Sequence, residues 1–218
     1  GSITIDVADN KTLTYSGTAI SLGANTLTLS GGGTLSNTNA FVLNNANSKL
    51  LLNSITVDSV STTIDNSLGV DVDNDSTITS LSVANITPVS IASGKTLSGA
   101  ITVTAGSINL DETGTLASTV EMSGGVLDAD ESLTVSGALT QSGDTTIDVA
   151  DNKTLTYSGS AISLGANTLT LSGGGTLSNT NAFVLNHASS KLLLSSITVD
   201  NVSTSANSLG LDVDNNST

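Results

Sequence analysis

One long stretch of this chain occurs twice, and that duplication constrains the fold more than any other feature. The string IDVADNKTLTYSG at residues 5–17 returns unchanged at residues 147–159, an offset of 142 residues (147 − 5). The match ends with DVDNDST at residues 71–77 against DVDNNST at residues 212–218, one residue having been lost on the way. Faithful repetition at a long period is typical of repeat architectures.

The duplication also predicts how the chain is organised. We expect a long repeat over residues 1–142 and a partial second copy over residues 143–218, together forming one continuous unit over residues 1–218. No domain boundary is expected between the copies, because neighbouring units of an array bury their apolar ends against each other.

Within the long repeat, short segments alternate apolar and polar residues and end in Gly, Asn, Asp or Ser. Examples are TLTYSG at residues 12–17, TLTLSGGG at residues 26–33 and LTVSG at residues 133–137. Alternation with a period of two, together with many β-branched residues, predicts β-strands. Seven such units fill the 142 residues, or about 20 residues per unit, a length typical of solenoid coils.

Each unit has room for three short strands, so the sequence predicts an all-β fold, a parallel β-helix (β-solenoid). One coil has too few aliphatic side chains to offset the conformational entropy that it loses on folding, so stability should come from stacking. The five lysines precede what reads as the same strand of successive units. We expect them to neutralise neighbouring aspartates at a coil corner.

The charge balance argues against several kinds of partner. The chain has 19 acidic and 5 basic residues, and its net charge at pH 7 is −14. Nucleic acids and anionic membrane surfaces are both bound through clustered Lys and Arg, which are missing here. No apolar run reaches the length that a membrane-spanning helix needs. We therefore expect no nucleic-acid partner and no membrane insertion.

The residues that catalysis needs are scarce. Serine is abundant, but the single histidine, His187, stands where the other copy has Asn45. A catalytic base present in one of two near-identical copies is an implausible purpose for both, so we interpret His187 as a tolerated surface residue. Carboxylate pairs could serve glycoside chemistry, yet the chain has no Arg and few aromatic residues to accompany them. We expect neither an enzyme nor a cofactor.

Aspartates alternate with other residues along two corresponding segments, and five of them are candidate calcium ligands. These are Asp71, Asp73, Asp75, Asp212 and Asp214. Alternation places such side chains on the outer face of a strand, about 7 Å apart. Oxygen-rich clusters suit Ca²⁺, but Ser76 stands where an EF-hand loop would need Gly. A solvated acidic face and a calcium site both remain open as interpretations.

Threonine pairs in TxT spacing, such as Thr12 with Thr14 and Thr26 with Thr28, would stack into ranks if the coils were in register. Regular ranks of this kind could bind ice. We expect Leu51, Asp71 and Asp73 at the matching outward positions of the next coils, where they would interrupt the lattice.

Units such as NKTLTYSG at residues 10–17 and ESLTVSG at residues 131–137 resemble the Ser/Thr/Gly/Asn-rich coils of bacterial surface proteins, namely filamentous-haemagglutinin-like adhesins and autotransporter passenger domains. The resemblance covers the whole chain and is compositional. It implies a right-handed parallel β-helix in an extracellular or cell-surface location. It implies no particular functional residue, because such coils have none in common.

The leading functional interpretation is a structural module of a fibre, filament or stalk, in which near-identical repeats supply length and stiffness. The expected partners are copies of the chain, head-to-tail or lateral, because a solenoid has open strand edges at its ends. The alternative is an adhesin-type binding module that contacts glycans, a surface or calcium through one face of the rod. Differences between the two copies scatter over apolar and polar positions, which favours the structural interpretation.

Overall fold

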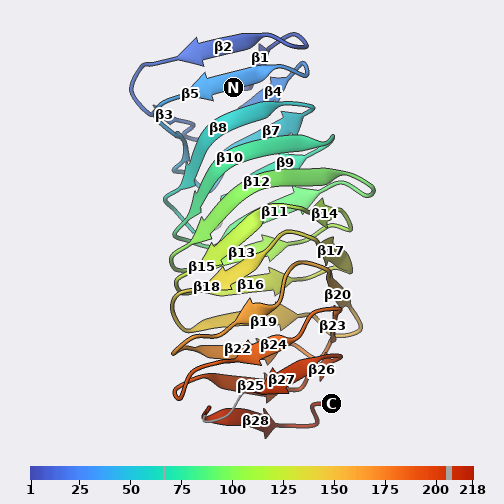
Figure 1. Ribbon diagram of the computed structural model, residues 1–218. Coiled ribbons are helices and arrows are strands. Elements are labelled where there is room, and N and C mark those ends of the chain that lie inside the picture. The colour runs from blue at the N-terminus through green and yellow to red at the C-terminus, as the bar shows by residue number, and fades with distance from the viewer. Residues whose placement is uncertain (66, 205–207) are drawn as a thin grey trace.

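The computed structural model describes residues 1–65, 67–204 and 208–218. Short parallel strands stack one above the other along an elongated molecule, and β2 and β28 lie at its opposite ends (Figure 1). The predicted all-β solenoid is therefore confirmed. Each coil supplies one strand to each of up to three faces, as predicted, and the corners between faces are short turns.

The strands are mostly two to five residues long, and the longest has eight. Their bounds are β1 (Ile3–Asp6), β2 (Thr12–Tyr15), β3 (Ile20–Ser21), β4 (Thr26–Ser30), β5 (Thr34–Asn37), β6 (Phe41–Leu43), β7 (Lys49–Asn53), β8 (Thr56–Thr62), β9 (Gly69–Val72), β10 (Ser76–Val83), β11 (Thr87–Ile91), β12 (Thr96–Val103), β13 (Ser107–Leu110), β14 (Thr115–Leu116), β15 (Thr119–Met122), β16 (Val126–Ala129), β17 (Leu133–Val135), β18 (Leu139–Gln141), β19 (Thr145–Val149), β20 (Thr154–Tyr157), β21 (Ile162–Ser163), β22 (Thr168–Ser172), β23 (Thr176–Asn179), β24 (Phe183–Leu185), β25 (Lys191–Ser195), β26 (Thr198–Val199), β27 (Val202–Thr204) and β28 (Gly210–Asp214).

Three faces run along the molecule. Face A is an 11-stranded sheet in the order β1-β4-β7-β9-β11-β13-β16-β19-β22-β25-β28. Face B follows the order β2-β5-β8-β10-β12-β14-β17-β20-β23-β26. Face C contains the remaining short strands, and the long strands β8, β10 and β12 continue into it from face B. Eleven strands in face A correspond to ten steps from coil to coil.

The core consists of aliphatic ladders that run through the stack. In face A, Leu29 of β4 pairs in register with Leu52 of β7, which pairs with Val72 of β9. All three side chains are fully buried. Polar residues at the alternate positions face outward, so the period-two pattern of the sequence maps directly onto the inside and outside of the rod.

Identical sequences show that burial depends on stacking. Leu13 in the first coil is 46% exposed, whereas its repeat partner Leu155 is fully buried. Tyr15 is half-buried, and its partner Tyr157 is 1% exposed. The difference arises because a preceding coil covers β20, while no described strand covers the outer edge of β2. Burying one such aliphatic side chain stabilises the fold by about 1.5–3 kcal/mol.

The spatial period of the stack differs from the period of the sequence. Seven coil steps along face A lead from Ile3 to Val149, a separation of 146 residues. The sequence repeats every 142 residues. Strand pairing therefore runs four residues (146 − 142) ahead of the sequence repeat after seven coils. In face B the gain occurs at two places. Thr77 pairs with Ser98, two residues after Thr96, the first threonine of β12. Thr134 pairs with Thr156, two residues after Thr154, the first threonine of β20.

The predicted position of the lysines is wrong in part. Lys49 and Lys191 begin β7 and β25 of face A, whereas Lys11, Lys95 and Lys153 precede strands of face B. Both faces show the same alternation closed by small residues, so alternation cannot tell one face from the other. The predicted number of coils is correct. The comparison of units within the sequence, however, equated strands of face A with strands of face B.

Gly99 lies where the register between β10 and β12 shifts, and it should tolerate no side chain. Its φ is 118°, and a Cβ there would lie 1.8 Å from the carbonyl oxygen of Ile78. Gly94 has a φ of 71° but open space around a Cβ, so it is a matched control. Gly94→Ala should cost only the left-handed strain of about 1–2 kcal/mol, a drop in Tm of roughly 2–8 °C.

We expect Gly99→Ala to lower Tm at least twice as much as Gly94→Ala, as measured by thermal unfolding followed by circular dichroism. Equal shifts for the two variants would contradict the close backbone approach at the register shift.

Candidate functional site

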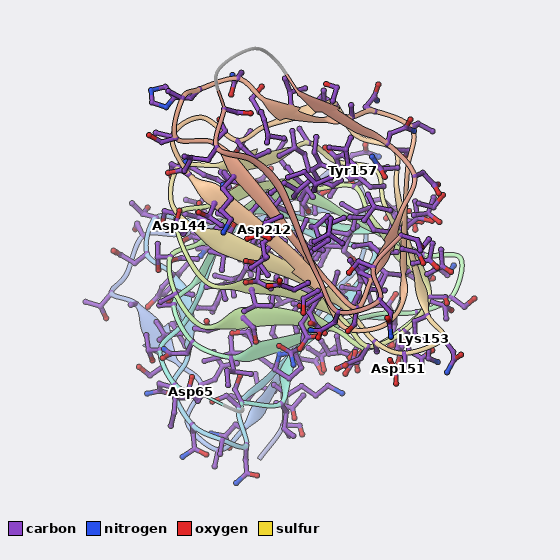
Figure 2. The ribbon with its side chains drawn as sticks, turned by 90° about the horizontal axis from the view of Figure 1, so that it is seen from below. Asp65, Asp144, Asp151, Lys153, Tyr157 and Asp212 are labelled. Atoms are coloured by element: carbon purple, nitrogen blue, oxygen red, sulfur yellow. The ribbon has the colours of Figure 1, made fainter. Side chains whose placement is uncertain are left out.

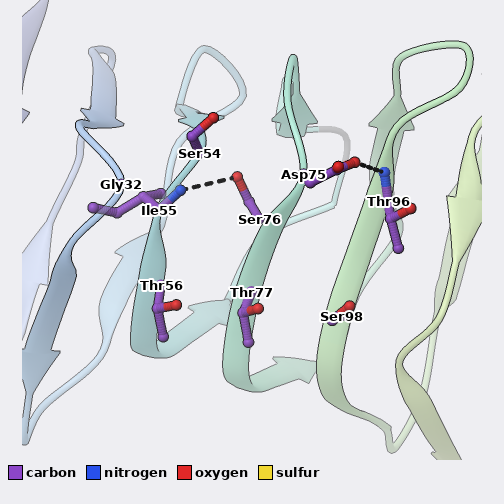
Figure 3. A pocket seen from close by; sticks show the side chains of 9 residues that line it. All are labelled: Gly32, Ser54, Ile55, Thr56, Asp75, Ser76, Thr77, Thr96 and Ser98. Atoms are coloured by element: carbon purple, nitrogen blue, oxygen red, sulfur yellow. Dashed lines mark hydrogen bonds between the residues drawn. The ribbon is translucent and has the colours of Figure 1, made fainter. Parts of the chain in front are cut away.

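The turns from face A to face B differ in length, and the differences hollow out one corner of the rod. Turns of three, two and three residues follow β4, β7 and β9, at residues 31–33, 54–55 and 73–75. The turns before and after this group are longer, five residues at 7–11 and four at 92–95. The short turns are therefore recessed between longer ones, and a groove of about 320 Å³ lies over them (Figure 3).

The groove is lined mainly by hydroxyl groups. Its lining residues are Gly32, Ser54, Ile55, Thr56, Asp75, Ser76, Thr77, Thr96 and Ser98. Two contacts between successive coils fix its floor. The backbone N–H of Ile55 donates to Ser76 Oγ at 3.3 Å, and the backbone N–H of Thr96 donates to Asp75 Oδ1 at 2.8 Å (Figure 3). The Asp75 carboxylate therefore anchors the next coil and brings a negative charge to the groove.

Threonines on face B stack in register through the groove. Thr34 pairs with Thr56, Thr56 with Thr77, and Thr77 with Ser98. Neighbouring strands lie about 4.8 Å apart, so these outward hydroxyls form a regular rank along the rod. A rank of hydroxyls beside a carboxylate can exchange hydrogen bonds with a polyhydroxylated ligand. Sequence reasoning missed this groove, although the lengths of the turns carried the signal.

The interruption expected for the TxT ranks holds on face A only. There Thr28 pairs with Leu51, and Leu51 pairs with Asp71. Thr12 lies on face B, where its partner in the next coil is Thr34. The two TxT sets therefore belong to different faces of the rod.

The candidate calcium ligands lie on face A and at its corner with face B, and they do not form one row. Asp71 pairs with Lys49 at 2.5 Å, and its repeat partner Asp212 pairs with Lys191 at 2.8 Å. Asp212 lies on the outer side of face A in the view along the rod (Figure 2). The hydrogen bond to Asp212 raises the pKa of Lys191. Exposed ion pairs of this kind contribute little to stability.

The other three candidates are arranged differently. Asp73 and Asp75 lie in the turn after β9 rather than along the strand, while Asp214 ends β28 on the exposed side of face A. Within residues 1–65, 67–204 and 208–218, no group of three or more His, Cys, Asp or Glu side chains is arranged to hold a metal ion. The calcium site stays a prediction.

Carboxylates do gather near Asp71 through the coil stacking. Burial raises the pKa of Glu112, and the negative charges of Asp71, Asp111 and Asp73 raise it further. Glu112 belongs to the turn after β13, two coils away from Asp71. The corner is thus an acidic surface that Lys49 neutralises in part.

The pairing register of neighbouring strands on face A brings two further carboxylates together. Asp128 of β16 lies directly opposite Asp148 of β19, and Asn109 of β13 lies on its other side. Burial raises the pKa of Asp128 to about 6, with further contributions from the charges of Asp130 and Asp148. Ser172 donates a hydrogen bond to Asp148.

This pair should make stability depend on pH in a defined direction. The pKa of Asp128 is higher in the folded chain than its ordinary value of 3.8, so its contribution to stability is complete below pH 3.8 and is lost as the pH rises through about 6. Asp128→Asn removes the buried charge. At pH 8 we expect Tm to rise by roughly 2–4 °C, because solvent screens part of the effect at this partly exposed carboxyl.

At pH 4 the same variant should unfold with the wild-type Tm, because Asp128 is then largely protonated. Asp9→Asn, at an exposed corner, is the control and should show no such pH-dependent difference. A gain of equal size at both pH values would contradict the assigned role of the Asp128 charge.

The single histidine has a structural role in a turn. His187 Nδ1 accepts a hydrogen bond from the backbone N–H of Ser189 at 3.1 Å. In the first copy, Asn45 Oδ1 accepts the corresponding bond from the N–H of Asn47 at 2.9 Å. The imidazole nitrogen therefore replaces the amide oxygen in the same turn, which explains why the two copies can differ here.

Comparisons with known proteins assign no family. No protein-family model matches the chain, and neither a curated protein nor a solved structure matches it significantly. In the part of the chain that the structure describes, no helix has the length and apolar character needed to cross a membrane. The resemblance to adhesins and autotransporter passengers stays a prediction.

Proposed function

We propose that this chain is a structural repeat module that gives length and stiffness to an extracellular or cell-surface fibre, filament or stalk. The observation that carries the proposal is the continuity of face A, in which eleven strands pair in sequence order along the rod. Bending such a rod would break parallel backbone pairing on one side and separate aliphatic ladders inside. The extracellular or cell-surface location is supported by the compositional resemblance alone.

The ends of the rod support association with further copies of the chain. Ile3 is 63% exposed and Leu13 is 46% exposed at one end, while Leu211 and Val213 are 46% and 52% exposed at the other. These inward-facing positions are buried in interior coils, and the outer edges of β1 and β28 have no partner among the described strands. Open edges with apolar ladders behind them favour head-to-tail association.

Lateral association faces an electrostatic obstacle. The chain carries a net charge of −14, and Asp71, Asp73 and Glu112 gather at one corner. Two rods brought side by side would repel each other unless cations screened or bridged these carboxylates. Calcium would then act between rods, and head-to-tail contacts would need none.

We further infer that the chain is not an enzyme. The hydroxyls of the groove have no imidazole beside them, because His187 serves a turn elsewhere. The Asp75 carboxylate accepts the backbone N–H of Thr96 through Oδ1, and this bond holds the next coil. An activated nucleophile needs an adjacent base that is itself oriented, and the groove supplies none.

Self-association can be tested by negative-stain electron microscopy and light scattering at several protein concentrations. Ten coil steps make a single rod of about 50 Å, and we expect longer filaments of uniform width as concentration rises. Leu13→Asp places a charge at an end and should shorten the filaments severalfold. Rods of single length at every concentration would contradict self-assembly. Calcium should produce bundles, reversed by chelation, without lengthening individual filaments.

A second candidate function rests on the groove itself. Its volume of about 320 Å³ lies at the lower end of the range typical of small-molecule sites. Hydroxyls of Thr56, Thr77 and Ser98 line it beside the carboxylate of Asp75. These groups match the donors and acceptors of a sugar. The alternative proposal is therefore an adhesin-type module that binds glycans through this groove.

Glycan binding can be tested on a glycan array with a matched pair of variants. Thr77→Val removes one hydroxyl from the groove while keeping a β-branched side chain, and we expect at least tenfold weaker binding. Thr156→Val changes an outward threonine of face B outside the groove and should bind like the wild type. Equal loss in both variants, or no binding to any glycan, would contradict the groove as a glycan site.

A further inference from the structure

A further groove lies in the middle of the stack, at the corner through which the chain enters face A. Its volume is about 440 Å³, and it opens over the starts of β16, β19 and β22. Turns of three residues precede β16 and β19, whereas four residues precede β22 and five precede β25. The shorter turns are therefore recessed beside the longer ones. We call this the second groove, and the groove beside Asp75 the first groove.

The two grooves lie on opposite borders of face A. The second groove contains Asp144, in the turn before β19. Asp151 belongs to the turn after β19, and it lies on the opposite side of the rod from Asp144 (Figure 2). The first groove opens over turns of this later kind, which lead from face A to face B. A ligand in one groove would therefore leave the other groove free.

The second groove repeats the backbone arrangement of the first. In each groove, an aspartate stands immediately before a strand, and its Oδ1 accepts the backbone N–H of the first residue in the next strand of the same face. Asp144 accepts from Thr168 at 2.7 Å, and Asp75 accepts from Thr96 at 2.8 Å. Both carboxylates are thereby fixed at the rim of a groove.

The outward hydroxyls coincide in register as well. Two residues after its aspartate, each groove has a threonine that pairs with a hydroxyl-bearing residue of the next coil. Thr146 pairs with Thr170 in the second groove, and Thr77 pairs with Ser98 in the first. The two aspartates are 69 residues apart (144 − 75), which differs from the repeat period of 142. The same set of donors and acceptors therefore occurs at two corners independently of the duplication.

Apolar side chains border the hydroxyls of the second groove. Thr146 pairs with Val126 of the preceding coil, and Thr170 pairs with Leu193 of the following coil. Val126 and Leu193 are half-buried and occupy outward positions of face A. The row across these four coils thus offers hydroxyls in its middle and C–H surface at both ends. A sugar ring presents the same combination of hydroxyl groups and apolar C–H faces.

We propose that the second groove binds a neutral sugar, so that the chain carries two separate sites for this class of ligand. The hydroxyls of Thr146 and Thr170 can donate and accept hydrogen bonds, and the carboxylate of Asp144 accepts them. The choice of ligand class rests on the glycan-binding alternative of the proposed function. The site itself is independent of the first groove.

Charge and composition define the ligand further. Asp144 and the net charge of −14 repel uronic acids and sulfated sugars, so the ligand is a neutral sugar. No aromatic side chain lines either groove in the described part of the chain. Each site should therefore bind weakly, because the large contact area that an aromatic ring provides is missing.

The test is a titration of the isotopically labelled full chain with cellobiose, maltose and lactose, followed by amide chemical shifts in NMR spectra. We expect at least one of these neutral disaccharides to shift the amides of Thr146 and Thr170 saturably. Glucuronate is the charged probe and should cause no saturable shift there. Thr170→Val should weaken binding in the second groove at least fivefold. Thr156→Val, at an exposed position of face B outside both grooves, is the matched control and should change nothing.

The two grooves give separate signals, so this proposal and the glycan-binding alternative can fail separately. Shifts at Thr146 that Thr170→Val weakens and Thr77→Val leaves intact support the second site, whether or not the first groove binds. Shifts confined to Thr77 and Ser98 would support the first groove alone and overturn this proposal. It would also be overturned by equal loss in Thr170→Val and Thr156→Val, by glucuronate binding as tightly as the disaccharides, or by no saturable shift with any of them.

Discussion

In-register stacking of parallel strands is the interaction on which every other feature of this molecule depends. Leu13 and Leu155 have the same sequence neighbours, yet only Leu155 is buried, because another coil covers it. The backbone hydrogen bonds follow the same rule, since a parallel strand satisfies its groups only through its neighbours. Cooperativity is therefore passed along the rod, and each coil is stable to the extent that its neighbours are in place.

The constant core leaves the corners free to vary. Aliphatic ladders such as Leu29, Leu52 and Val72 require one side chain per coil at each inward position, but a turn between faces can lose or gain residues without disturbing them. The hydroxyl-lined groove and the acidic corner near Asp71 both result from this freedom. Chemical character on this rod is thus set by turn length and by what stacking brings together.

The sequence predicted the solenoid and the number of coils per long repeat, because period-two alternation and exact duplication both depend on residue type alone. It could not predict which strands share a face, so Lys49 at the start of β7 and Lys11 before β2 were interpreted as preceding the same type of strand. The Asp128–Asp148 pair was missed for a related reason. These residues are 20 apart (148 − 128), and only the register of β16 on β19 brings them opposite each other. A site composed of residues from successive coils requires the phase of the stack, which composition and spacing do not contain.

The four-residue difference between the spatial period and the sequence period has a geometric consequence for any longer array of such repeats. Four residues correspond to about 13 Å around the perimeter, while seven coils advance about 34 Å along the axis. Equivalent surface features in successive repeats would therefore follow a screw path, completing one revolution in about five repeats at about 21 residues per coil. A straight partner could touch only one groove or acidic corner in each revolution, and a partner that engaged the features of successive repeats would have to wind around the rod. Rods that associate laterally through these features would supercoil about each other.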